Sequence, residues 1–301
     1  MNVEPTPNEV EVQSVKERPF IRNVKNFYRS FKKNKSALVG AYLIIFLILL
    51  SLIGPFIFPL NITATNYADK MLGPSSEYWF GTDAHGRDIF KRIIHGLWIT
   101  MSIGFLSTLL GGIAGVVIGI VSGYYGGAID AIIMRIMDVL LAFPGILLAL
   151  ALVSVFGASK ENVIYAIAIA AVPSFARIVR GSTLATKNLE YIDAMRALGA
   201  SDLRIIFLHI LPNVSSPIIV QGSLFMATAI LSASGLSFLG MGVRPPSPEL
   251  GAMLSDGRDY IRYAGHITLF PGLVIMLIVL SFNLLGDGLR DALDPKSQSR
   301  K

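Results

Sequence analysis

The chain has 301 residues, of which 53% are hydrophobic and only 15% are charged, and its formal net charge is +6. Soluble domains usually contain about 25% charged residues, so this composition argues against an ordinary soluble domain and favours a membrane protein. The sequence has no cysteine, which excludes disulfides and thiol catalysis.

Six apolar segments with few charged residues follow one another along the chain. Each is long enough, or nearly so, to cross a bilayer, which takes about 20 residues in a helix. They predict an all-α integral membrane protein with six transmembrane helices. The predicted bounds are 37–58, 98–123, 136–156, 162–180, 214–239 and 268–287. The first segment is too long to be the apolar region of a cleavable signal peptide.

The distribution of basic residues predicts the orientation. Eighteen of the 26 Lys and Arg residues lie on one side of these helices, in 1–36, 124–138, 177–213 and 290–301. The positive-inside rule places this side, and with it both chain ends, in the cytoplasm of a multi-pass cell membrane protein. The same bias accounts for the net positive charge, so no nucleic-acid partner is needed to explain it.

A stripe of apolar residues with basic residues between them precedes the first helix. This stripe consists of Phe20, Ile21, Val24, Phe27, Tyr28 and Phe31. The spacing is helical and predicts an amphipathic helix that lies in the inner headgroup region.

The second predicted helix contains four glycines at intervals of four residues, Gly111, Gly115, Gly119 and Gly123. This spacing places a smooth groove on one helical face, where another backbone can approach closely. It predicts a helix-packing surface, either within the chain or against a second membrane subunit.

Prolines predict bends in the next two helices. Pro144 lies near the middle of the third predicted helix, and Pro173 lies inside the fourth. Arg135 and Asp138, at the start of the third helix, are three residues apart and predict a local ion pair.

The fifth predicted helix is rich in small hydroxyl side chains and carries no charge. Such a wall can line a polar conduit that does not hold its cargo tightly, although the same hydroxyls also commonly bond between helices. Both interpretations remain open from the sequence. The candidate conduit residues are Gln221, Ser223, Thr228, Ser232 and Ser234.

The segment YIDAMRALGASDLRIIFLHILPN, residues 191–213, interrupts the apolar pattern. Gly199 suits the left-handed position that ends a helix, Ser201 is a candidate N-cap for a second helix, and Pro212 is expected to close it. We predict a short cytosolic helical hairpin over 186–213. It is either a docking surface for a partner or an amphipathic loop on the membrane.

Familiar catalytic and nucleotide-binding motifs are missing. The chain contains no GxxxxGK[ST], HExxH or GxSxG motif. The predicted helix centres also lack Asp, Glu, Lys and Arg, which ion-coupled carriers commonly place there. These absences disfavour a membrane enzyme and a secondary carrier that acts alone. Energy for transport is therefore expected to come from another polypeptide.

The hairpin resembles the cytoplasmic EAA loop of permease subunits in binding-protein-dependent ABC importers. Asp-Ala-Met stands at the EAA positions, followed by the motif glycine and the closing Leu-Pro. The departures are Asp for Glu, Met for Ala, and His209 for Ile; the His-Ile-Leu-Pro-Asn variant is similar to the peptide-importer branch. The residues expected to couple this chain to an ATPase are Asp193, Ala194, Met195, Ala197, Gly199, Ala200, Leu211 and Pro212.

Four further stretches resemble dipeptide and oligopeptide permeases: Trp79–Gly96, Gly123–Pro144, Leu236–Leu254 and Phe282–Pro295. The resemblance implies a type I importer permease fold and a non-catalytic subunit that moves di- or oligopeptides. Its implied partners are a second related permease, two cytosolic ATPase subunits and an extracytoplasmic peptide-binding protein. ATP and Mg would be used by the ATPases, with no cofactor on this chain. Nickel, glutathione or another small solute remains an alternative cargo.

With this resemblance, the chain divides into four parts. These are a cytosolic tail (1–36), the first helix with its outer loop (37–97), a permease core (98–290) and a second tail (291–301).

In the outer loop, Asp83, Arg87 and Asp88 are expected to bond the loop to itself or to contact the binding protein. Asp83, His85 and Asp88 could also suggest a metal site. We expect no metal there, because three ligands in one loop do not define a coordination geometry.

Overall fold

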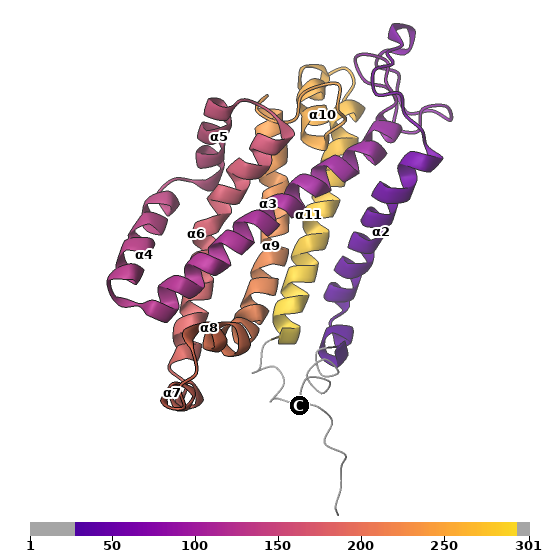
Figure 1. The fold of residues 1–301 in the computed structure, drawn as a ribbon. Coiled ribbons are helices and arrows are strands. Elements are labelled where there is room, and N and C mark those ends of the chain that lie inside the picture. The colour runs from indigo at the N-terminus through magenta and orange to yellow at the C-terminus, as the bar shows by residue number, and fades with distance from the viewer. Residues whose placement is uncertain (1–27, 294–301) are drawn as a thin grey trace, which may run out of the picture.

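The computed structural model describes residues 28–293. All secondary-structure elements in this range are helices (Figure 1). Residues 1–27 and 294–301, which include most of the predicted interfacial helix, lie outside the described residues. Five helices are long and apolar enough to cross a membrane, and a bent pair of helices makes a sixth candidate span.

The long helices are α2 (Lys35–Ile57), α3 (Ile89–Tyr125), α6 (Lys160–Lys187), α9 (Leu211–Phe238) and α11 (His266–Leu293). The bent pair consists of α4 (Gly127–Leu141) and α5 (Gly145–Phe156). Shorter helices are α7 (Glu190–Ala197), α8 (Asp202–Ile205) and α10 (Leu250–Gly257), with a π-helical turn at Ile206–Ile210. Single 3-10 turns occur at Tyr67–Asp69 and Arg258–Tyr260.

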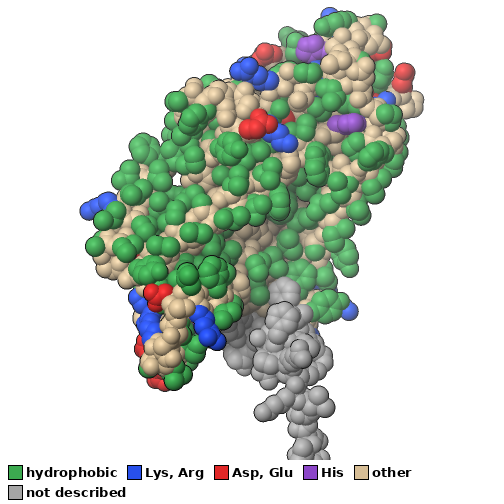
Figure 2. All heavy atoms as spheres, viewed as in Figure 1, with side chains coloured by type: hydrophobic (Ala, Val, Ile, Leu, Met, Phe, Trp, Pro, Cys, Tyr) green, Lys and Arg blue, Asp and Glu red, His purple; other side chains and the backbone are tan. Residues whose placement is uncertain are grey.

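The bundle has two distinct ends (Figure 1). The hairpin end carries α7 and α8, together with the start of α2 and the end of α11, and we predict it to be cytosolic. The opposite end, called the loop end, carries α10 and residues 58–88. Charged side chains gather at these two ends, and the surface between them is mostly hydrophobic (Figure 2). This apolar belt is what a lipid-embedded bundle requires.

Helix α3 crosses the bundle diagonally and packs closely along α6 (Figure 1). The glycine ladder makes this approach possible. A Cβ atom at Gly115 would lie 2.4 Å from the Cβ of Phe175 and 2.8 Å from the carbonyl oxygen of Val172. At Gly119 it would lie 2.6 Å from the Ala176 carbonyl oxygen. Gly111 and Gly123 also face α6, so the ladder packs within the chain.

The predicted third helix, 136–156, is two helices in the structure. Helices α4 and α5 meet at 87°, and Pro144 is the residue that precedes α5. Proline has no N–H to continue the hydrogen bonds of α4 and restricts the residue before it, so the chain turns there. The predicted bend at Pro144 is confirmed. By contrast, α6 continues through Pro173 without interruption.

Helix α3 begins at Ile89, nine residues earlier than the predicted span at 98. The predicted span excluded the segment with Lys91 and Arg92 because these residues are charged. In the structure Arg92 is only 2% exposed, and its Nε atom lies 3.7 Å from a carboxylate oxygen of Asp83. Because an acidic partner at the loop end offsets this charge, the helix extends past it.

Three clusters of buried apolar side chains hold the bundle together. The first joins α2, α3, α9, α10 and α11, and the second joins α3, α5, α6 and α9. The third attaches the hairpin to α3, α6 and α9. The hairpin is therefore part of the packed body of the protein.

Candidate functional site

Helix α7 ends in a tight turn at Gly199. This residue has φ of +81°, and its N–H donates to the Arg196 carbonyl oxygen at 2.9 Å. The N–H of Ala200 donates to the Met195 carbonyl oxygen at 3.0 Å, which completes a Schellman motif. The predicted left-handed glycine is confirmed. Ser201 precedes α8 in the N-cap position, but its side chain makes no capping hydrogen bond.

Pro212 does not close the second helix, contrary to the sequence prediction. Helix α8 passes through the π-helical turn into α9, and residues 202–238 form one continuous helix. The Leu211 N–H bonds to the Ile206 carbonyl oxygen, five residues earlier. This wider turn accommodates the proline that follows, which has no N–H to donate. The hairpin is therefore continuous with a long apolar helix.

Apolar side chains fasten the hairpin to the bundle. Ile192, Ile205 and Ile210 are each 0% exposed and belong to the cluster shared with α3 and α6. Fully burying one such side chain contributes about 1.5–3 kcal/mol. The hairpin is therefore expected to move with the helices beneath it.

Tyr124, at the end of α3, links four segments at this point. Its hydroxyl donates to a carboxylate oxygen of Asp202 at 2.7 Å, and the Arg196 guanidinium lies 5.4 Å from its ring centre. Lys187, at the end of α6, donates to its carbonyl oxygen. Sequence reasoning missed this role, because a tyrosine at the end of a span is usually an interfacial anchor.

We expect Tyr124→Phe to lower the free energy of unfolding by about 1.5 kcal/mol, since it removes a hydrogen bond to a charged group and keeps the ring. Thermal unfolding of the purified protein measures this loss. Tyr125→Phe is the matched control, because Tyr125 is the adjacent residue and is 48% exposed. Equal effects of the two changes would contradict the anchoring role.

The side of the hairpin that is not packed against the bundle, called its open side, combines small and apolar residues. Asp193, Ala194 and Ala197 are exposed, whereas Met195 and Ala200 are half-buried. Four large apolar side chains that sequence reasoning did not select are also exposed: Leu198 (83%), Leu203 (65%), Phe207 (61%) and Leu208 (60%). An exposed apolar group of this kind is typical of a surface that contacts a partner protein or a membrane. The sequence signal was that 203–210 is apolar on more than one face.

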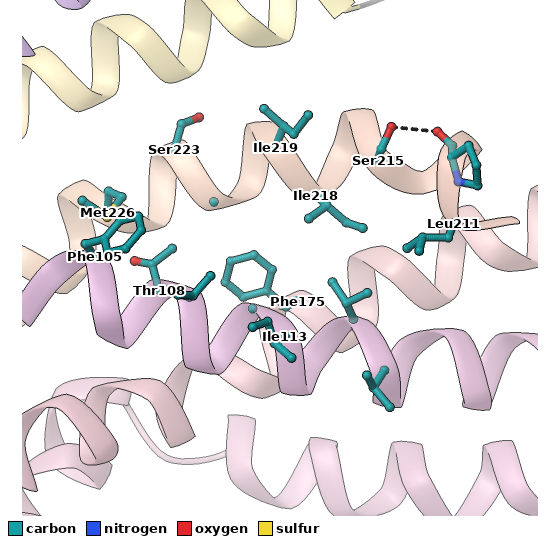
Figure 3. Close-up of a pocket in the computed structure, with 16 residues that line it drawn as sticks. Phe105, Thr108, Ile113, Phe175, Leu211, Ser215, Ile218, Ile219, Ser223 and Met226 are labelled. Carbon is teal, nitrogen blue, oxygen red and sulfur yellow. Dashed lines mark hydrogen bonds between the residues drawn. The ribbon is translucent and has the colours of Figure 1, made fainter. Parts of the chain in front are cut away.

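Leu211 and Pro212 lie apart from this open side, at one end of a groove between α3 and α9. The groove has a volume of about 760 Å³ (Figure 3). Its three hydroxyl groups are already bonded within their own helices. Thr108 donates to the Gly104 carbonyl oxygen, Ser215 to Pro212 and Ser223 to Val220. The groove therefore presents an apolar surface.

The candidate conduit residues do not share one face of α9. At 100° per residue, Gln221, Thr228 and Ser232 fall on one face, and Ser223 and Ser234 fall on the opposite face. Ser234 is 4% exposed and packs against Gly251 of α10, so it lines no open path in this structure. Thr228 and Ser232 line a cavity of about 270 Å³ beside the break between α4 and α5.

The charged residues of the outer loop are bonded inside the protein. A carboxylate oxygen of Asp83 lies 2.6 Å from Nε of Arg87, and both residues are buried. Arg87 also reaches Asp256 of α10 at 3.4 Å, and Asp88 caps the start of α3. This network joins the loop to α3 and α10. Among the described residues, no group of three or more His, Cys, Asp or Glu side chains could hold a metal ion.

We expect Asp83→Ala to lower the free energy of unfolding by about 3–5 kcal/mol, because it removes the carboxylate nearest to the buried Arg87 and Arg92. The yield of folded protein and its thermal unfolding temperature measure the loss. Asp259→Ala is the control, since it breaks an ion pair with Arg258 whose side chains are 77% and 60% exposed. Such a pair contributes about 0–1 kcal/mol. A comparable loss from both changes would show that the Asp83 network is not structural.

Comparison with known proteins identifies the class. Residues 115–299 match the family described as binding-protein-dependent transport system inner membrane component. Residues 24–74 match the N-terminal TM domain of oligopeptide transport permease C. The chain belongs to this family: it is a multi-pass, non-catalytic permease subunit of an inner-membrane ABC importer. The complex includes ATPase and binding-protein partners, and the ATPases carry the nucleotide sites.

Individual relatives are similar over most of their length. The dipeptide transport system permease protein DppC of Alkalihalophilus pseudofirmus is 48% identical over 272 residues, covering 90% of each chain. The glutathione transport system permease protein GsiD of Pectobacterium atrosepticum is 47% identical, covering 91% of this chain and 92% of that one. The inward-facing MetNI methionine ABC transporter has a TM-score of 0.57 at 20% identity, over 68% of this chain and 98% of that chain, which supports the fold.

Proposed function

We propose that this chain is one permease of a heterodimeric pore that imports di- or oligopeptides. The observation that carries the proposal is the 48% identity to a dipeptide permease over 90% of the chain, together with the oligopeptide permease domain at residues 24–74. A second related permease, two ATPase subunits and an extracytoplasmic peptide-binding protein complete the complex. Glutathione is the second candidate cargo, because a glutathione permease is 47% identical.

In this proposal the hairpin, 186–213, docks on one ATPase. Three observations support this role: its open side carries small and apolar residues, its inner side is anchored at Tyr124, and α8 is continuous with α9. When nucleotide draws the ATPases together, the hairpin moves as a rigid lever and turns α9 toward the outward-facing state. Asp193, which pairs with Arg196 at 3.2 Å, stands where the motif has glutamate.

Uptake by the reconstituted complex tests this function. The complex of this chain with its partner permease and ATPases would be placed in sealed vesicles with the binding protein and a labelled dipeptide. We expect accumulation that requires ATP and the binding protein, with weaker competition from glutathione than from unlabelled dipeptide. Accumulation by this chain alone, driven by a sodium or pH difference, would overturn the proposal. Stronger competition from glutathione than from dipeptides would favour the second cargo.

A further inference from the structure

Two of the hollows along α9 differ in whether their hydroxyl groups already have hydrogen-bond partners. In the groove toward α3, all three hydroxyls are bonded to backbone oxygens of their own helices. In the cavity on the other side, the hydroxyls of Ser174, Thr228 and Ser232 form no hydrogen bond with any described residue. An unsatisfied polar group in hydrocarbon costs several kcal/mol, so this second face needs water or a polar ligand.

An exposed ion pair lies about one helical turn from the lining of this cavity. Nη2 of Arg177 is 2.7 Å from a carboxylate oxygen of Asp138, and their side chains are 58% and 53% exposed. Arg177 follows Ser174 by three residues, and Asp138 precedes Leu141 by three, so each lies one helical turn from a residue that lines the cavity. The predicted local pair of Asp138 with Arg135 is therefore wrong, because Asp138 bonds across to α6.

The neighbouring pair between the same two helices has a different character. Arg180 donates from Nε and Nη2 to both carboxylate oxygens of Asp130, at 2.5 and 2.6 Å, and these side chains are only 31% and 17% exposed. Such a bidentate, half-buried pair holds α4 to α6. In the Asp138–Arg177 pair, only one guanidinium nitrogen of Arg177 contacts the carboxylate, and both side chains are exposed. An exposed pair of this type contributes about 0–1 kcal/mol, so it can exchange partners at little cost.

We propose that this cavity is the cargo site of the conduit, and that Arg177 and Asp138 bind the charged termini of a short peptide. The proposal rests on the peptide cargo proposed above. Ionisable residues within membrane spans almost always face the bundle interior or a water-filled cavity, and this pair lies near the cytosolic ends of the predicted spans, so the proposal places it at the inner mouth of the conduit. The Arg177 guanidinium donates two hydrogen bonds to the terminal carboxylate, and the released Asp138 carboxylate accepts a hydrogen bond from the terminal ammonium group.

The dimensions suit a short peptide. An extended dipeptide spans about 7 Å. Arg177 and Asp138 are in contact in the structure, so a bound dipeptide must separate the two side chains by about this length. One helical turn is about 5.4 Å, so a guanidinium of Arg177 that turns toward Ser174 provides most of that separation. The free hydroxyls of Ser174, Thr228 and Ser232 can then bond its peptide group. These neutral contacts are weak, as a site that must release its cargo requires.

Reaction of introduced cysteines tests whether this face is wet. The natural chain has no cysteine, so Thr228→Cys and Ser232→Cys each provide a single thiol on this chain. The probe is a charged methanethiosulfonate reagent, applied to the nucleotide-free complex in lipid nanodiscs. Ile219→Cys is the control, because Ile219 is a half-exposed residue of the same helix that lines the apolar groove. We expect at least tenfold faster labelling at 228 and 232. Equal rates would overturn the proposal.

Protection by peptide tests the recognition step. We expect alanyl-alanine, added directly without binding protein, to slow labelling of Thr228→Cys at least fivefold, and N-acetyl-alanyl-alanine amide to give no protection. Arg177→Gln and Asp138→Asn should each abolish the protection, whereas Arg135→Gln, which removes a charge from the exposed surface of α4, should retain it. Protection that persists in Arg177→Gln would overturn the proposal, as would equal protection by the blocked peptide.

Two further results separate a binding role from a structural role. The double variant Asp138→Asn, Arg177→Gln keeps two side chains of similar size that can still bond to each other, so it should fold at the normal yield and yet lose protection. ATP-driven uptake by the unmodified complex examines the proposed function separately. Peptide uptake without peptide protection would overturn only this cargo site. The absence of peptide uptake would overturn the proposed function and the site together.

Discussion

Gly115→Leu is expected to prevent the close packing of α3 on α6 and to reduce the yield of folded protein roughly tenfold. Even a Cβ atom at this position would lie 2.4 Å from the Cβ of Phe175 and 3.1 Å from the backbone nitrogen of Ala176. Backbone atoms of a packed helix cannot move aside as a flexible side chain can. Overpacking at such a site costs about 1–3 kcal/mol or more. Size-exclusion chromatography of the detergent-extracted protein measures the yield.

A pair of alanine substitutions separates packing from helix propensity. Gly112→Ala places its Cβ 3.6 Å from the ring of Phe175, which is an ordinary contact, whereas Gly115→Ala creates the close contacts described above. Both changes raise the intrinsic helix propensity by about 1 kcal/mol, so this contribution cancels in the comparison. We expect Gly112→Ala to be neutral or stabilising and Gly115→Ala to lower the unfolding temperature. Equal unfolding temperatures would show that α3 does not approach α6 at Gly115 as the structure describes.

Gly199→Val is expected to reduce co-purification of the ATPase at least fivefold while leaving membrane insertion intact. The space around Gly199 is open, with no atom within 4 Å of a Cβ built there, so no neighbour is displaced. The cost comes from the backbone, because a residue with a Cβ at φ of +81° pays about 1–2 kcal/mol and a β-branched one pays more. The Schellman turn should open and shift the exposed side of α7 away from its partner.

Two substitutions control for the other consequences of this change. Gly199→Asn should retain ATPase binding, since asparagine adopts the left-handed conformation more readily than other residues. Gly181→Val introduces the same side chain into α6 at a position that is also open, and it should leave the hairpin unchanged. Undiminished co-purification of the ATPase with Gly199→Val, together with full uptake, would argue against docking through the hairpin.

Several features could be predicted from the sequence because they depend on local spacing. Bilayer thickness sets a minimum length for apolar segments, so their positions followed from charge and hydropathy alone. Pro144 and Gly199 act through their own backbone restrictions, and both turned the chain where expected. The glycine ladder likewise predicted a close approach, although the sequence could not name the helix that approaches.

The tertiary structure decided which residues meet across helices. Asp138 pairs with Arg177 rather than Arg135, and Arg92 lies beside Asp83, which lets α3 start at Ile89. The five candidate conduit residues separate onto two opposite faces, and only the neighbours of α9 distinguish the apolar groove from the cavity with free hydroxyls. Sequence spacing defines the faces of one helix relative to each other. The rotation of that helix toward its neighbours results from packing contacts between residues far apart in the chain, which no local pattern encodes.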